Sequence, residues 1–196
     1  MANFKVIYDA CIFYPAPLRD LLVRLAQTRR FRARWTEAIH SEWINSLYAK
    51  RPDIEPGKLE AVAEQINAAV PDCLITGYEH IVQELELPDE KDRHVLAAAI
   101  RAGAAAIRAG AAAIITLNMK DLPSTVLGEY EILAIHPDDF ILDLADLEPQ
   151  VLERVAKAQR QALRRPPLDP EGFVSVLRRQ ELPGVADFLN ARLDLI

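Results

Sequence analysis

The sequence FKVIYDACIF, residues 4–13, begins the alternation of strands and helices from which the fold can be predicted. Its residues 4–9 are rich in β-forming types and predict a buried strand, and prolines follow at positions 15 and 17. Asp9 stands at the carboxyl end of this strand. Because a buried carboxylate without a partner is costly, Asp9 predicts a polar site at that end.

Strands and helices alternate along the first 140 residues. The strand patterns lie at 4–9, 30–36, 73–77, 112–116 and 131–136. Helical spacing of apolar residues fills the segments between them, including a helix after a Thr36 cap and an alanine-rich helix that begins at Asp92. This order predicts an α/β fold with a parallel sheet and right-handed crossovers. From residue 138 onward the pattern is helical, so residues 141–196 are expected to form a helical extension.

The composition excludes several classes of protein. The chain has 196 residues, 51% of them apolar, and a net charge of −6, which argues against a protein that coats nucleic acid through bulk charge. We expect no membrane span and no signal peptide, since apolar runs are too short and the N-terminus enters a strand directly. Cys11 and Cys73 show no metal-ligand spacing. The cytoplasm is therefore the expected compartment.

The charges are segregated along the chain. Six arginines lie between positions 19 and 34 against a single acid, Asp20; they are Arg19, Arg24, Arg29, Arg30, Arg32 and Arg34. Acidic residues gather elsewhere, at 89–92 and 138–148. This pattern fits an anionic ligand held beside an acidic centre, and it equally fits solvated helix faces.

Four segments carry acidic or amide side chains to one edge of the predicted sheet. These candidates are Asp9, Glu42, Asp92, Asn118 and Asp121. Ligands of parallel α/β sheets bind outside the carboxyl ends of the strands, and clustered carboxylates with open water positions suit Mg²⁺ or Mn²⁺. Taken singly, Asp92 is also explained as a helix cap and Glu42 as an exposed helix residue.

Four motifs in order resemble the PIN-domain nucleases, and most closely the branch with the VapC-type toxins. They are VIYDACIFYPAPLRDLL (6–22), WTEAIHSEW (35–43), LPDEKDRHVLAAAI (87–100) and ITLNMKDLP (115–123). The resemblance covers roughly residues 4–140. It implies a three-layer, parallel-sheet PIN-like domain at 1–140 and an added helical extension at 141–196.

The resemblance also implies an activity and a set of site residues. The family consists of metal-dependent endoribonucleases, so Asp9, Glu42 and Asp92 are implied as ligands of Mg²⁺ or Mn²⁺. The fourth position departs from the family pattern, because Asn118 stands where an aspartate is typical and Asp121 is the nearest carboxylate. Implied partners are an RNA substrate, contacted by the six arginines, a cognate antitoxin and a second copy in a homodimer. The chain is thus predicted to be the toxin of a type II toxin–antitoxin pair.

Other interpretations stay open at this point. The altered fourth position also suits a catalytically impaired RNA-binding or protein-interaction module. A phosphatase with an Asp-x-Asp nucleophile is disfavoured because Cys11 occupies the second acidic position, and a receiver domain lacks its paired acids. His94 has two interpretations, a contact near the metal or phosphate, and an ordinary residue of the helix's first turn. His40 and His136 receive no role.

A tandem repeat of the heptad IRAGAAA follows Asp92, at 100–106 and 107–113. Seven residues make about two helical turns, so the insertion preserves the buried face of a helix. We expect the helix to extend towards Gly110, the alternative being that the second copy loops out. The repeat also lets AAAIRA and AAAIIT compete for one strand position, which decides whether Thr116 and Asn118 reach the site.

Overall fold

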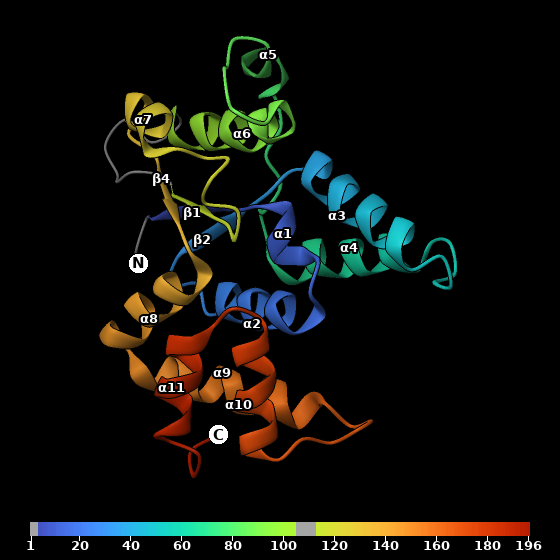
Figure 1. Cartoon of the computed structure of the whole chain (residues 1–196), viewed down its shortest axis with the longest axis vertical. Helices are drawn as coiled ribbons and strands as arrows, with labels where there is room; N and C mark the ends of the chain where they lie inside the picture. Colours follow the sequence, from blue (N-terminus) through green and yellow to red (C-terminus); the bar gives the residue numbers. More distant parts are fainter. Residues whose placement is uncertain (1–3, 105–112) are drawn as a thin grey trace.

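A four-stranded parallel sheet forms the centre of the protein (Figure 1). The computed structural model describes residues 4–104 and 113–196. The strands are β1 (Lys5–Tyr8), β2 (Arg32–Arg34), β3 (Ala113–Ile115) and β4 (Leu133–Ile135), in the order β2-β1-β3-β4. In the centre of the sheet, Val6 pairs with Ala33 of β2 and with Ala113 of β3. The predicted α/β parallel-sheet fold is confirmed.

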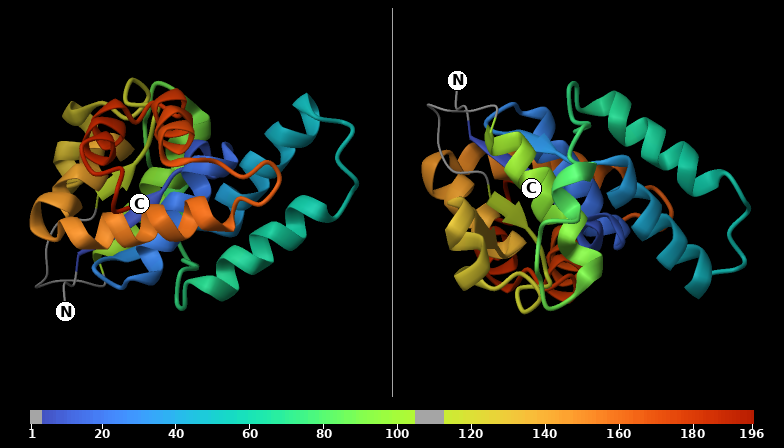
Figure 2. Two further views of the ribbon diagram at one scale, coloured as in Figure 1. Left: turned by 90° about the horizontal axis from the view of Figure 1, so that it is seen from below. Right: turned by 90° about the horizontal axis from the view of Figure 1, so that it is seen from above.

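Short and long helices connect these strands. They are α1 (Ala10–Phe13), α2 (Ala16–Gln27), α3 (Glu37–Lys50), α4 (Lys58–Ala69), α5 (Glu79–Val82), α6 (Arg93–Ala104) and α7 (Ser124–Leu127), with 3-10 turns η1 (Glu90–Asp92) and η2 (Gly128–Tyr130). The side chain of Thr36 accepts a hydrogen bond from the Ile39 amide, as its predicted capping role requires. Helices α3 and α4 run side by side and project from the rest of the molecule (Figure 2).

The sheet lies between two layers of helices. Successive side chains of a strand point to opposite faces, so Lys5 and Tyr8 of β1 report on the two faces separately. The Lys5 ammonium donates to the Ala102 carbonyl of α6 at 2.7 Å, and the Tyr8 hydroxyl donates to the Leu22 carbonyl of α2 at 3.1 Å. Figure 1 accordingly shows α6 and α2 on opposite sides of the strands. The predicted three-layer arrangement is confirmed.

Aromatic side chains fill the core on the α2 face. Tyr8 stacks on Trp35 with ring centres 6.0 Å apart, and Phe13 meets Trp35 edge-on at 5.3 Å. His40 belongs to this core: it is buried, its Nδ1 accepts from Trp43 Nε1 at 2.9 Å, and its Nε2 lies 2.8 Å from the Asn67 side-chain oxygen. Burial lowers the pKa of His40, which suits a neutral structural histidine.

The segment 73–77 differs from its prediction as a strand. It makes a single parallel bridge, between Leu74 and Trp35, at the outer edge of β2. The backbone explains the difference, because Asp72 before the segment and Gly77 at its end adopt left-handed conformations, with φ of 58° and 72°. Such residues turn the chain and keep the pairing from extending.

The repeated heptad is only partly described. Helix α6 runs to Ala104, and most of the second copy, with the choice between an extended helix and a loop, lies outside the described residues. The competition between the two strand sequences is decided, however. Strand β3 begins at Ala113, so AAAIIT occupies the sheet position and Thr116 follows it directly.

Four helices form the C-terminal part of the chain, as predicted from residue 138 onward. They are α8 (Pro137–Leu147), α9 (Pro149–Ala162), α10 (Pro170–Arg179) and α11 (Pro183–Asn190). They pack beneath α2 in Figure 1, where the side-chain amide of Gln159 donates to the Pro17 carbonyl at 2.8 Å. The predicted boundary between residues 140 and 141 falls inside α8, and the division into two domains stays a prediction. Among the described residues, no helix is long and apolar enough to cross a membrane.

Asp138 of α8 supplies the N-terminal cap of α11 from across the fold. Its buried carboxylate accepts from the amides of Gly184 and Val185, each at 2.8 Å. We expect Asp138→Ala to destabilise the protein by about 1–2 kcal/mol, because the buried Val185 amide and the part-buried Gly184 amide lose their acceptor. Thermal unfolding should show a melting temperature lower by about 3–6 °C. The neighbouring exposed Asp139→Ala is the matched control, and equal effects of both would contradict this assignment.

Candidate metal centre

Asp9 lies where the end of β1 meets the end of β3. Its side chain is 5% exposed and caps α1, accepting from the Ala10 amide at 2.6 Å. The other carboxylate oxygen accepts from the Thr116 hydroxyl at 2.6 Å and from the Cys11 thiol at 3.1 Å. Burial raises the pKa of Asp9, and these hydrogen bonds oppose the rise. The hydrogen-bond partner that the buried Asp9 carboxylate requires is therefore the hydroxyl of Thr116, at the end of β3.

Asp92 is the buried acid at the centre of the candidate site. It ends the 3-10 turn before α6 and is 8% exposed, and its Oδ2 has no hydrogen-bond partner in the described part of the chain. Burial raises its pKa to about 7, with further contributions from the charges of Asp9, Glu42, Asp89 and Asp121. A carboxylate with a buried oxygen that lacks a hydrogen-bond partner, surrounded by four other acids, is suited to coordinate a cation.

Asp89, which the sequence prediction missed as a site residue, performs the capping role considered for Asp92. Its side chain accepts from the Lys91 amide at 2.9 Å. Carboxylate oxygens of Asp89, Asp92 and Asp121 all lie within 4.8 Å of one another. Three carboxylates this close repel each other unless a cation joins them, and oxygen ligands suit Mg²⁺ or Mn²⁺. The spacing Asp89-x-x-Asp92 within one turn was the available signal.

At the fourth position of the site, Asp121 supplies the carboxylate and Asn118 holds it by a hydrogen bond. The Asn118 side-chain amide donates to the Asp121 carboxylate, and the Asn118 backbone amide donates to the Thr116 hydroxyl at 2.9 Å. Asp121 thus faces Asp92, while Asn118 links Asp121 to the end of β3. The structure places the carboxylate of Asp121, held by the amide of Asn118, beside the other acids.

Glu42 reaches the site from the first turns of α3, where it contacts a histidine. The Nε2 atom of His94 lies 3.0 Å from a Glu42 carboxylate oxygen. The other ring nitrogen of His94 is buried and unpaired within the described residues. Of the two interpretations of His94, the structure favours a contact beside the acidic site, because its ring contacts the Glu42 carboxylate.

The six arginines of the basic segment do not gather at the acidic site. Three have partners within the chain: Arg19 donates to the Phe13 carbonyl and lies over the Trp43 ring, Arg24 pairs with Asp20, and Arg30 pairs with Glu148. Arg29, Arg32 and Arg34 instead line a pocket at the edge of β2. Arg32 pairs with Lys5, about 13 Å along β1 from Asp9, and Arg34 pairs with Ile7, about 7 Å along β1 from Asp9.

The sequence profile of the PIN domain family matches residues 5–120, more than half of the chain. The chain belongs to the PIN domain family. A second profile, the VapC50 C-terminal domain, matches residues 137–191 of this PIN-domain protein. The prediction of a PIN-domain nuclease of the VapC-type branch is confirmed by these matches and by the relative described next.

One curated relative is a Mycobacterium tuberculosis (strain ATCC 25618 / H37Rv) protein named "Putative ribonuclease VapC50", which is 40% identical over 90 residues. The match covers 46% of this chain and 49% of the relative, so the PIN-domain protein matches about half of the relative's length. No solved structure gives a significant match. The PIN profile includes Asp9, Glu42 and Asp92 and ends one residue before Asp121, whose place in the site comes from the structure.

Proposed function

We propose that this PIN-domain protein is a metal-dependent endoribonuclease that hydrolyses phosphodiesters of RNA. The observation that carries the proposal is the meeting of carboxylate oxygens of Asp89, Asp92 and Asp121 within 4.8 Å of one another, together with a buried Asp92 oxygen that has no hydrogen-bond partner among the described residues. The family match and the ribonuclease named among its relatives support the same activity. Mg²⁺ or Mn²⁺ is the proposed cofactor, since both prefer carboxylate oxygens.

Each acidic residue has a separate part in the proposed mechanism. Asp89, Asp92 and Asp121 would hold the ion. Asp9 would add a further carboxylate from the end of β1, and Glu42 would be oriented by His94. A divalent ion bound here supplies a Lewis acid for the phosphodiester and a lowered pKa for an attacking water. Thr116 holds Asp9, and Asn118 holds Asp121, so both carboxylates keep their direction without reorganisation when RNA binds.

The biological setting is proposed from the relatives. The VapC-type match supports the toxin of a type II toxin–antitoxin pair, acting on RNA in the cytoplasm and silenced by a cognate antitoxin. We also propose a homodimer. Of the six arginines, Arg29, Arg32 and Arg34 form no ion pair with the described residues, and these three are candidates for contact with anionic partners.

A mixed RNA pool incubated with the purified protein tests the proposed activity. We expect cleavage in Mn²⁺, none in EDTA, and none by Asp9→Asn in Mn²⁺, because Asp9 loses its charge while its amide keeps the size of the side chain. The matched control is Asp53→Asn, which removes an exposed acid paired with Arg51 and should cut like the wild type. Cleavage in EDTA, or equal cleavage by Asp9→Asn, would refute the metal-dependent mechanism.

The alternative is a PIN-like module that binds RNA or protein without catalysis. Asn118 in place of an aspartate favours it, because the site loses one charge at that position. Asp121 counters this argument by bringing a carboxylate beside Asp92. Measuring metal binding distinguishes the nuclease from the non-catalytic module. An absence of cleavage together with no Mn²⁺ effect on the melting temperature would support the binding module.

A further inference from the structure

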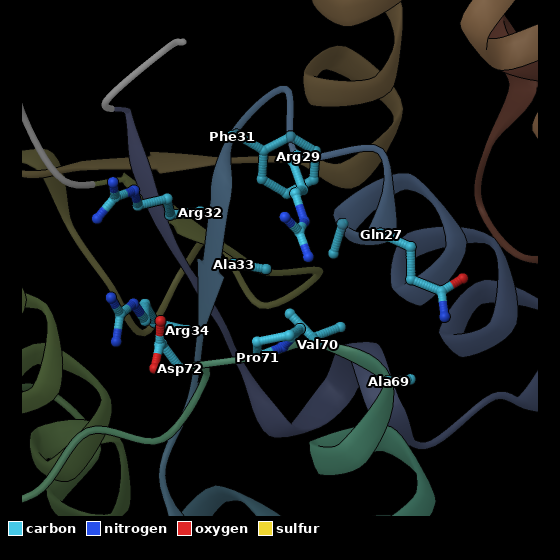
Figure 3. Close-up of a pocket in the computed structure, with 11 residues that line it drawn as sticks. Gln27, Arg29, Phe31, Arg32, Ala33, Arg34, Ala69, Val70, Pro71 and Asp72 are labelled. Carbon is cyan, nitrogen blue, oxygen red and sulfur yellow. The ribbon is translucent and has the colours of Figure 1, made fainter.

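A pocket of about 520 Å³ lies at the outer edge of β2, between the ends of α2 and α4 (Figure 3). Apolar side chains contribute to its lining, among them the buried Phe31 and Val70. In Figure 3, Arg32 and Arg34 extend to one side of β2, while Arg29 lies on the other side. Guanidinium groups therefore stand on two sides of this pocket.

The positive charges of the pocket have no ionic partner in the described part of the chain. Arg29, Arg32 and Arg34 make no ion pair with any described residue. The single acid of the lining, Asp72, is exposed. Partial burial and the charges of Arg34 and Arg32 lower the pKa of Lys5, which adds a further cation beside them. Cations this close repel one another, so an anionic ligand would stabilise the group.

The side chains of this edge are accessible, whereas its backbone is not. Arg29 and Arg32 are exposed, and Arg34 is half-buried. Ala33, between the last two, is 3% exposed, and the chain's own residues 73–75 lie beside the end of β2. A ligand of this pocket is therefore bound by guanidinium groups and not by strand pairing.

We propose that this pocket binds phosphate groups of an RNA strand, at a site separate from the acidic centre; this rests on the proposed function, in which RNA is the substrate. Guanidinium groups bind phosphate oxygens by paired hydrogen bonds, and contacts to phosphates position a nucleic acid without reading its sequence. Arg34 and Arg32 lie about 7 Å and about 13 Å along the strand direction from Asp9. The two arginines thus stand at successive distances from the acidic centre, as the successive phosphates of one strand do.

Two features favour RNA over an acidic protein segment. A peptide at a strand edge gains affinity by backbone pairing, which the buried Ala33 does not offer. A sugar–phosphate chain needs side-chain contacts only, and it carries a charge at every nucleotide for the arginines on both sides of β2. The one aromatic residue of the lining, Phe31, is 3% exposed and gives bases no platform for stacking. Binding should therefore depend little on base sequence.

Fluorescence anisotropy with a labelled ten-nucleotide oligouridine tests the RNA site on the full-length protein, in EDTA so that binding is measured without cleavage. We expect binding at low salt, weakened by about tenfold or more when Arg32→Gln and Arg34→Gln are combined. The logarithm of the affinity should also fall less steeply with the logarithm of the salt concentration, the slope changing by about 0.7 for each arginine removed. The combined Arg154→Gln and Arg179→Gln variant removes the same charge at exposed positions and should bind like the wild type.

Two left-handed residues of the lining separate the effect of charge from that of stability. Arg29 and Asp72 have φ of 60° and 58°, a conformation that glycine adopts without steric cost and asparagine tolerates. Arg29→Gly should therefore keep or raise the melting temperature and still weaken oligouridine binding several-fold. Asp72→Asn removes the acid of the pocket and should strengthen binding. Its matched control is Glu131→Asn, an exposed acid with φ of 56° outside the pocket, which should leave binding unchanged.

Failure of this RNA site and failure of the nuclease give different results. Unchanged oligouridine binding by the folded arginine variants would overturn the RNA site, and melting temperatures check that these variants fold. Displacement of the oligouridine by inorganic phosphate at an equal concentration, or by oligoglutamate at a lower one, would overturn it as well. Arginine-dependent binding in EDTA without any cleavage in Mn²⁺ would support the RNA site and refute the nuclease alone.

Discussion

Asp92→Asn is expected to abolish RNA cleavage and, at pH 7.5, to raise the melting temperature of the metal-free protein. The buried Asp92 carboxylate is surrounded by Asp9, Glu42, Asp89 and Asp121, and its pKa is raised to about 7. Removing its charge relieves that repulsion and the cost of its burial, so the metal-free melting temperature should rise by about 3–6 °C. The same change removes a central ion ligand, and cleavage should fall by about 100-fold or more.

The opposed directions of these two effects make the prediction specific. A merely structural carboxylate would lower the melting temperature when changed, and an exposed one would change neither quantity. Asp143→Asn, an exposed acid of α8, is the control for the loss of one negative charge. Differential scanning calorimetry in EDTA gives the stability, and cleavage of the RNA pool in Mn²⁺ gives the activity. A lowered melting temperature with retained cleavage would show that Asp92 is not a residue of the metal site.

The parts of the site that the sequence predicted are those fixed by local chemistry. Asp9 closes a strand, and a strand that ends in a buried acid needs partners at that edge, which Thr116 and Cys11 provide. Thr36 precedes a helical pattern and caps it as expected. In both cases, the residue and the segment that dictates its role are adjacent in the chain, so the sequence pattern contains the necessary information.

The parts that the sequence did not predict depend on contacts between distant segments. Asp89 joins the carboxylate group because the 3-10 turn η1 brings it beside Asp121, and the spacing Asp89-x-x-Asp92 by itself does not show that Asp121 lies there. The six arginines look like one basic patch in the sequence. In the fold, Arg30 pairs with Glu148 at the end of α8, more than a hundred residues away, whereas Arg32 lines the pocket beside β2. Their division follows from tertiary packing alone.

Mn²⁺ is expected to raise the melting temperature of the wild-type protein strongly at pH 8 and hardly at all at pH 5.5. With the pKa of Asp92 at about 7 in the folded protein and near 3.8 when unfolded, the folded protein holds the extra proton between these values. The metal-free stability should therefore fall as pH rises from about 4 to about 7, and level off above. A bound cation requires the deprotonated carboxylate, so its stabilisation appears as that proton leaves.

At an Mn²⁺ concentration 100 times the Kd, the stabilisation is about 2.7 kcal/mol, which corresponds to a shift of about 5–10 °C for a chain of this size. Thermal scans from pH 5.5 to 8, with and without Mn²⁺, measure this dependence directly. Asp92→Asn should show no Mn²⁺ shift at any pH, because it lacks the titrating ligand. If the wild type were stabilised equally at pH 5.5 and pH 8, the ion would bind elsewhere, since a site built on Asp92 must compete with its proton.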